Sequence, residues 1–173
     1  MARYKGAKWV GCSPANYSTD RIAPVRLVVH IAQSSTLSGI IAWFENPDHG
    51  SQGPTSAHFG NPRWLFGRMV QFVDTDEMAY HCAQWNGTSI GVENVGYSGQ
   101  RLSLGQRIRM KRLIKWANEV HAIPVVYTGD PSVHGVIGHG KLPEGYLSHP
   151  YCPGEPVLAD INTIVHQINR KVA

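Results

Sequence analysis

The chain has 173 residues, of which 42% are hydrophobic and 16% are charged, and its formal net charge is +4. This length suits one globular domain with a substantial hydrophobic core, and the composition excludes an intrinsically disordered protein. No apolar run reaches the roughly 18 residues that a membrane-spanning helix requires, so we expect no membrane partner. The first residues carry no apolar core of the kind found in secretion signals, which predicts a chain without a signal peptide.

The domain organisation is predicted from the composition of the first residues. Residues 1–24 are rich in Gly, Pro, Ser and Asn and are predicted to form an irregular arm, followed by one domain over residues 25–173. Residues 25–30 form a short, mostly apolar run rich in β-branched residues, which indicates a buried strand that ends at His30. Apolar residues at helical spacing from Leu37 to Phe44 predict a helix, and a Gly/Pro loop follows over residues 46–55.

Four further segments have the composition of strands. They are residues 56–59 and 68–73, separated by a turn, then residues 89–93 and residues 135–139. Strands that alternate with helices favour an α/β domain, so we expect a single central mixed β-sheet covered by helices.

Two long helices are predicted in the second half of the chain. Ser103 and Gln106 have the spacing of a capping box that opens the first one. Its apolar stripe comprises Met110, Leu113, Ile114, Ala117 and Val120, and the final helix has Val157, Leu158, Ile161, Ile164, Val165 and Ile168 on one side. The basic residues Arg107, Arg109, Lys111, Arg112 and Lys115 are then expected on the solvated face of the first helix, which argues against a nucleic-acid partner.

Three chemically capable side chains stand at the ends of predicted strands: His30, Glu93 and His139. In α/β sheets functional residues gather where strands end. With Cys152, which precedes a Pro-Gly turn, the two histidines would supply three ligands of a catalytic zinc site and leave the fourth position to water. These three residues lie too far apart in the sequence to match a short zinc-binding motif. The alternative is therefore that His30 and His139 are core residues with their hydrogen bonds made and that Cys152 is an unreactive buried side chain.

The remaining cysteines and histidines carry weaker signals. The chain has three cysteines, so one stays unpaired under any disulfide scheme, and whether Cys12 and Cys82 pair is left open. We expect His58 to pack in the core or shape a cleft. Structural or surface roles are expected for His49, His81, His121, His134 and His166.

Five segments taken in order resemble the type 2 N-acetylmuramoyl-L-alanine amidases. They are residues 28–30 (Val-Val-His), 56–59 (Ser-Ala-His-Phe), 86–93 (Asn-Gly-Thr-Ser-Ile-Gly-Val-Glu), 136–139 (Val-Ile-Gly-His) and 152–154 (Cys-Pro-Gly). That family shares its fold with the peptidoglycan recognition proteins and includes phage endolysin domains. The resemblance extends from about Val25 to Ile168, so it covers most of the chain.

The resemblance implies an enzyme that hydrolyses the amide bond between N-acetylmuramic acid and L-alanine in bacterial peptidoglycan. It places the zinc ligands at His30, His139 and Cys152 and the catalytic carboxylate at Glu93. Zinc lowers the pKa of its bound water from about 15.7 towards 7. A neighbouring carboxylate takes the proton of that water and delivers it to the leaving amine.

The sequence departs from the family pattern at two positions. Many members have a Lys two residues before the third ligand, where this chain has Pro150, so we expect His149, or else Lys141, to take the role of that Lys in stabilising the oxyanion. Other members have a Tyr at the position of Ala57, so this chain resembles the subgroup that relies on the glutamate. Trp85 and Asn86 precede the Glu93 strand and are predicted to line the sugar–peptide groove.

Two other functions compete with the amidase. A non-catalytic module would bind peptidoglycan without cutting it, and a zinc peptidase would cut within the stem peptide. Non-catalytic relatives typically lose a zinc ligand, whereas all three are present here, which favours the enzyme. We expect a monomeric phage endolysin domain that waits in the host cytoplasm and acts on the cell wall after its release, and a bacterial cell-wall recycling amidase is the alternative origin.

Overall fold

Six strands form the central sheet of the computed structural model, which describes residues 2–170. They are β1 (Ala7–Trp9), β3 (Arg26–Ile31), β4 (Phe59–Asn61), β5 (Met69–Gln71), β7 (Ser89–Asn94) and β8 (Gly135–Gly138), in the order β1-β5-β4-β7-β3-β8. The strands β4, β7, β3 and β8 are mutually parallel, whereas β5 is antiparallel to β4. The predicted mixed sheet is therefore confirmed. Residues 171–173, the end of the predicted domain, lie outside the described residues.

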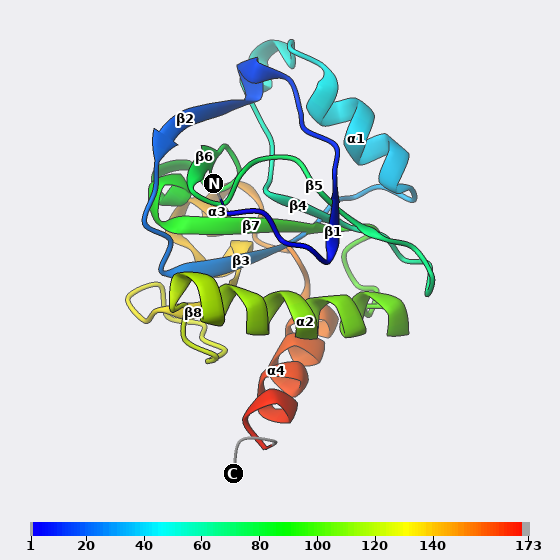
Figure 1. Cartoon of the computed structure of the whole chain (residues 1–173), viewed down its shortest axis with the longest axis vertical. Helices are drawn as coiled ribbons and strands as arrows, with labels where there is room; N and C mark the ends of the chain where they lie inside the picture. The colour runs from blue at the N-terminus through cyan, green and yellow to red at the C-terminus, as the bar shows by residue number, and fades with distance from the viewer. Residues whose placement is uncertain (1, 171–173) are drawn as a thin grey trace.

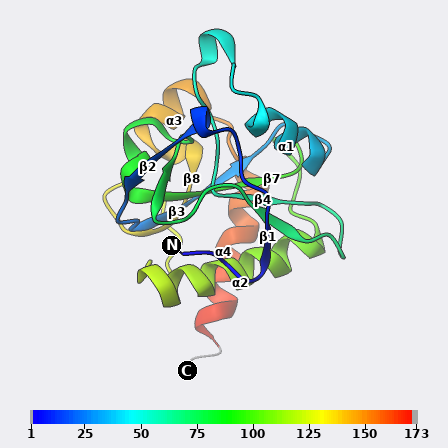
Figure 2. The ribbon, with the colours of Figure 1, turned by 45° about the horizontal axis from the view of Figure 1, so that its top comes forward.

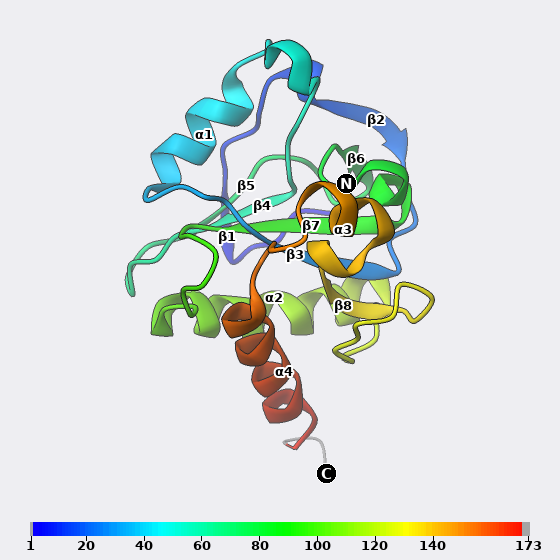
Figure 3. The same ribbon diagram turned by 180° about the vertical axis from the view of Figure 1, so that it is seen from behind.

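Helices cover both faces of this sheet, as predicted. They are α1 (Leu37–Glu45), α2 (Leu104–His121), α3 (Pro143–Ser148) and α4 (Glu155–Asn169). Figure 1 and Figure 3 show α2 and α4 on one side of the sheet and α1 on the other. In Figure 2, α3 lies beside β8 on the same side as α1. No helix of the described residues has the length and hydropathy of a membrane span.

The start of α2 agrees with the predicted capping box. The hydroxyl of Ser103 accepts a hydrogen bond from the backbone N–H of Gln106 at 3.2 Å, and the Gln106 side chain accepts one from the N–H of Ser103 at 2.9 Å. These two bonds satisfy N–H groups that would otherwise lack a partner at the helix start.

Strand register decides which side chains face the candidate site. Along β3, Leu27, Val29 and Ile31 belong to the core with α2 and α4, so Val28 and His30 point to the opposite face. In β7, Ile90 and Val92 belong to that same core. Glu93 lies directly opposite His30 in the parallel register, so the two side chains share one face.

The last turn of α2 corrects one core prediction. Val120, expected on the apolar stripe, is 48% exposed. His121 is instead the partly buried residue of that turn: its Nε2 lies 2.8 Å from the hydroxyl of Thr75, and its ring contacts Trp116 edge to face. The stripe turns gradually around a helix with 3.6 residues per turn, which brings His121 inward in place of Val120.

Arg109 corrects the expectation of a fully solvated basic face. Its side chain is buried, and it donates to the carbonyl oxygens of Pro62, Trp64, Leu65 and Gly67 and to Oδ1 of Asn61. The loop between β4 and β5 therefore packs on the first turns of α2. Helical periodicity alone contains no information about a distant loop that covers this face.

The first 24 residues contain two strands that the composition did not predict. The short edge strand β1 pairs in parallel with β5, and β2 (Tyr17–Arg21) pairs with β6 (Glu77–Ala79) in a separate two-stranded sheet. Both pairings join segments more than 50 residues apart, so neither is visible in a local pattern. The predicted strands at residues 56–59 and 68–73 appear as β4 and β5 with shifted or shorter bounds.

Candidate metal centre

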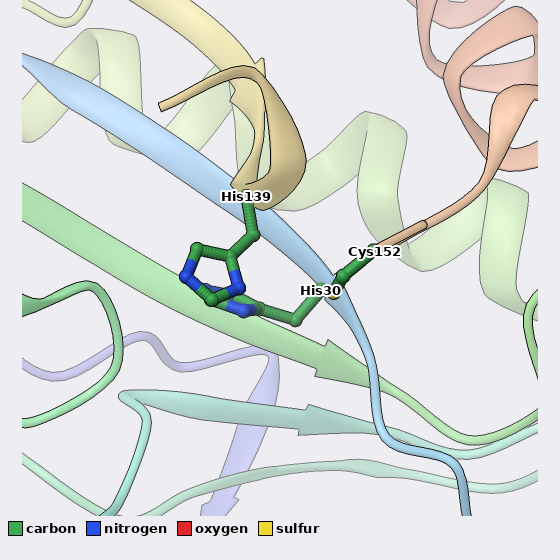
Figure 4. Close-up of side chains that lie close together, drawn as sticks. All are labelled: His30, His139 and Cys152. Atoms are coloured by element: carbon green, nitrogen blue, oxygen red, sulfur yellow. The ribbon is translucent and has the colours of Figure 1, made fainter. Parts of the chain in front are cut away.

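Three side chains from separate elements converge where β3 and β8 end (Figure 4). His30 is the penultimate residue of β3, His139 directly follows β8, and Cys152 lies in the loop between α3 and α4. One nitrogen of each histidine and the sulfur of Cys152 lie within 4.8 Å of one another. The structure therefore brings together the three residues that the sequence pointed to as ligands.

The sheet and a close turn hold these three residues together. Val29 pairs with Gly138 in the register of β3 and β8, so the residues that follow them, His30 and His139, are neighbours. The backbone N–H of Ile31 donates to the sulfur of Cys152 at 3.4 Å. A Cβ on Gly140 would lie 2.8 Å from the carbonyl oxygen of Cys152, so glycine permits this close approach of the loop.

The donor set matches the preferences of zinc. Burial lowers the pKa of His30 well below its ordinary value and that of His139 to about 4, so both rings are neutral at pH 7 and keep a lone pair for a metal. Burial raises the pKa of the Cys152 thiol to about 12, so this side chain becomes a thiolate only beside a cation. Tetrahedral ligands of one zinc ion lie roughly 3.5 Å apart, and the three candidate ligand atoms lie within 4.8 Å of one another before any ion draws them together.

Glu93 faces the three candidate ligands across a small cavity. Its Oε1 is 3.9 Å from Nδ1 of His30, and its Oε2 has no hydrogen-bond partner among the described residues. Burial raises the pKa of Glu93 to about 8. The cavity, of about 220 Å³, is bordered by the ligands together with Glu93, His81 and His149. A carboxylate with a raised pKa and a free oxygen is suited to exchange protons with a molecule in the cavity.

Of the two residues considered in place of the family's lysine, only His149 borders this cavity. Its ring stacks on that of His139, with centroids 5.3 Å apart, and its Nδ1 lies 2.8 Å from the hydroxyl of Ser148. Lys141 forms an ion pair with Glu155 at 3.0 Å.

Trp85 and Asn86 do not border the cavity. The indole N–H of Trp85 donates to Glu144 at 2.8 Å. The side-chain oxygen of Asn86 accepts the backbone N–H groups of His81 and Cys82 at 3.0 and 2.8 Å. Asn86 therefore shapes the turn that carries His81.

His81 belongs to the cavity, although its sequence suggested a structural or surface role. Its Nδ1 is 3.1 Å from Nε2 of His30. The sequence did contain one unused signal for this contact, Gly91, because a glycine inside a strand often marks a side chain or backbone that approaches closely. His58, by contrast, is fully buried: its Nδ1 accepts the N–H of Gly91, and its Nε2 lies 3.0 Å from the carbonyl oxygen of Glu77.

The two other cysteines are free thiols in separate parts of the core. Cys12 packs on the hydrophobic cluster beneath α1, and Cys82 belongs to the cluster beside α3. The Cys12–Cys82 disulfide that the sequence left open is therefore not formed in this structure.

Residues 20–155 match the model of a protein family described as N-acetylmuramoyl-L-alanine amidase. No curated protein sequence matches the chain at a significant level.

Solved structures share the fold at low sequence identity. A selenomethionine derivative of AmpD has a TM-score of 0.70 at 21% identity, with 94% of this chain and 96% of that one covered. A mutant endolysin from Bacillus subtilis has a TM-score of 0.68 at 18% identity, with 97% and 99% covered. The Staphylococcus aureus hydrolase AmiA, solved with its ligand, has a TM-score of 0.64 at 18% identity, with 99% and 87% covered.

Proposed function

The chain belongs to the N-acetylmuramoyl-L-alanine amidase family, and from this premise we propose that it is a zinc-dependent enzyme that cuts the amide bond between N-acetylmuramic acid and L-alanine in bacterial peptidoglycan. The observation that carries the proposal is the cluster of His30, His139 and Cys152. Beside it lies a carboxylate oxygen of Glu93 that has no hydrogen-bond partner within residues 2–170.

Each residue of the cluster has one task in this proposal. His30, His139 and Cys152 hold the zinc ion, which when bound supplies a Lewis acid and a water of lowered pKa. Glu93 takes one proton from the attacking water and passes it to the nitrogen of the leaving L-alanine as the C–N bond breaks. The water oxygen ends in the lactyl carboxyl group of muramic acid, and the peptide leaves with a free amine. His149 borders the same cavity and stabilises the oxyanion.

The partly buried position of Glu93 supports this assignment. A carboxyl group whose pKa lies near the working pH is able both to accept and to release a proton during one cycle, and burial raises this pKa to about 8. An exposed glutamate, ionised far below neutral pH, would be a poorer acid for the second transfer.

We propose further that the chain is the catalytic domain of a phage endolysin, monomeric, which stays in the host cytoplasm until it reaches the wall. Its support is the likeness to solved endolysins, one of them from Bacillus subtilis.

The new chemical groups at the ends of the product distinguish an amidase from a binding module and from a stem-peptide peptidase. Purified peptidoglycan is digested and new groups are identified by mass spectrometry. Free lactyl groups on muramic acid together with N-terminal L-alanine are expected. New amines within the stem peptide would indicate a peptidase, and no new ends in a protein that still sediments with the wall would indicate a binding module. Dialysis against a chelator should abolish the digestion and added zinc should restore it.

A further inference from the structure

His81 contacts a candidate ligand without belonging to the ligand set. It follows β6 in a turn, and its ring stands edge to face against that of His30, with centroids 5.2 Å apart. The close atoms are Nδ1 of His81 and Nε2 of His30, at 3.1 Å, a hydrogen-bond distance. The other nitrogen of His30, Nδ1, faces Glu93 at 3.9 Å. His30 therefore has one nitrogen turned to the cavity and the other turned to His81.

The hydrogen-bond partners determine where the protons lie. A neutral imidazole has one N–H and one lone pair. When Nδ1 of His30 offers its lone pair to a metal, Nε2 carries the hydrogen and donates it to Nδ1 of His81. His81 then has its own hydrogen on Nε2, which faces the carbonyl oxygen of Ser89 at 3.5 Å. In this arrangement His30 donates to His81, and His81 donates towards the carbonyl oxygen of Ser89.

The ring of His81 is held in this position from several sides. A Cβ on Gly91 would lie 2.6 Å from Cγ and 2.7 Å from Nδ1 of His81, so β7 has room for the ring only because residue 91 is a glycine. Asn86 binds the backbone N–H of His81. The ring of His58 packs edge to face against it at 5.7 Å, and both nitrogens of His58 face backbone groups.

We propose that His81 is a positioning residue that orients His30 for metal binding, and that Gly91 in the Ser-Ile-Gly-Val-Glu strand serves to admit its ring. The inference rests on the proposed zinc site. Groups that orient metal ligands by hydrogen bonds typically contribute 10- to 100-fold to metal affinity. His81 acts through the geometry and basicity of His30, so removing its acceptor weakens zinc binding even when no substrate is present.

The test compares variants that differ in the acceptor at the position of Nδ1. His81→Phe keeps a ring of similar size but has no acceptor, whereas His81→Asn places an amide oxygen near the position of Nδ1. Gly91→Ala leaves the imidazole unchanged and displaces it. His134→Phe, at an exposed histidine, is the matched control. Zinc dissociation constants are measured by chelator competition on preparations whose circular dichroism and melting show a folded protein.

His81→Phe and Gly91→Ala are expected to raise the zinc dissociation constant by about 10- to 100-fold. His81→Asn should stay within a few-fold of the parent, and His134→Phe should be unchanged. The absorption bands of the cobalt-substituted protein should shift in His81→Phe and much less in His81→Asn.

Equal zinc affinities and equal cobalt spectra in the parent and His81→Phe would overturn the role of His81 while leaving the zinc site intact. A parent protein that binds no zinc would overturn the proposed function and this inference together. If His81→Phe fails to fold, the comparison of His81→Asn with folded Gly91→Ala decides the matter, because only Gly91→Ala should then lose affinity.

Discussion

Arg109 and Glu93 are both ionisable residues with little exposure, and their surroundings differ in one respect. All five N–H groups of the Arg109 guanidinium meet an acceptor: four carbonyl oxygens of the β4–β5 loop and Oδ1 of Asn61. Glu93 has an oxygen without a partner among the described residues, and its pKa is raised to about 8. The first cluster is closed upon itself, whereas the second is open towards a cavity.

This difference separates structure from function within one fold. A buried polar group whose hydrogen bonds are all made stabilises the arrangement around it. A buried polar group without a hydrogen bond lowers the stability of the fold, so its presence needs a reason other than stability. Unsatisfied groups with perturbed pKa values are therefore candidates for chemistry. Substitutions in the Arg109 cluster should therefore lower stability and leave activity unchanged. Substitutions in the Glu93 cluster should lower activity and leave stability unchanged or increased.

The largest effect is expected for Cys152→Ser. A serine hydroxyl stays protonated where a thiolate would bind, so the variant should lose most of its zinc, and hydrolysis of peptidoglycan should fall to the background level. Zinc content by atomic absorption and lysis of cell walls are measured on the same preparation. Cys12→Ser, at a cysteine outside the cluster, is the control and should keep its zinc. A fully active, zinc-loaded Cys152→Ser variant would show that Cys152 is not a ligand.

Glu93→Gln should separate metal binding from proton transfer. The amide keeps the size of the side chain but cannot accept a proton, so turnover should fall by about 10² to 10⁴ while zinc and wall binding persist. Because no carboxylate then has to be buried, the melting temperature should stay the same or rise. His30→Ala, in contrast, should remove zinc and activity together. Near-normal turnover, or loss of zinc, in Glu93→Gln would show that the proton-transfer role is assigned to the wrong residue.

Arg109→Met tests the Arg109 cluster, in which every N–H of the guanidinium group has an acceptor. The change leaves several carbonyl oxygens of the β4–β5 loop without their donor, so the free energy of unfolding should fall by about 3–5 kcal/mol. Urea denaturation measures this change. Arg112→Met, at an exposed position on the same helix, should stay within about 0.5 kcal/mol of the parent. Turnover per folded molecule should be preserved; a turnover defect as large as that of Glu93→Gln would remove the distinction between the clusters.

The smallest effect is expected for the contribution of His58 to the pH dependence of stability. Burial lowers its pKa to about 4, whereas an unfolded chain titrates near its ordinary value of 6.5. Above pH 6.5 the ring is neutral in both states. As the pH falls from 6.5 to 4, only the unfolded chain takes up the proton, so stability decreases by about 2–3 kcal/mol.

NMR titration of the His58 ring in the folded protein checks this prediction, together with urea denaturation at pH 7, 5.5 and 4.5. The ring signals should stay constant down to about pH 5. A midpoint near 6.5 would show that His58 does not contribute to acid sensitivity.

The sequence by itself determined the elements whose patterns are local. The apolar period of α2 and α4, the capping box at Ser103 and the β-branched run of β3 each depend on residues a few positions apart, and each forms as predicted except for Val120 at the end of α2. The position of His30, Glu93 and His139 at strand ends is also local. Since ends of parallel strands meet at one edge of a sheet, these residues were expected to lie together.

Only the tertiary structure decided which groups meet across long separations. Arg109 is buried because a loop more than 40 residues earlier in the chain covers it, although its helix position predicted a solvated side chain. His81 contacts His30 across 51 residues. β1 and β2 each pair with a strand more than 50 residues away. Periodicity reports which face of an element is apolar, and the partner of a polar side chain on that element is set by how distant segments pack against it.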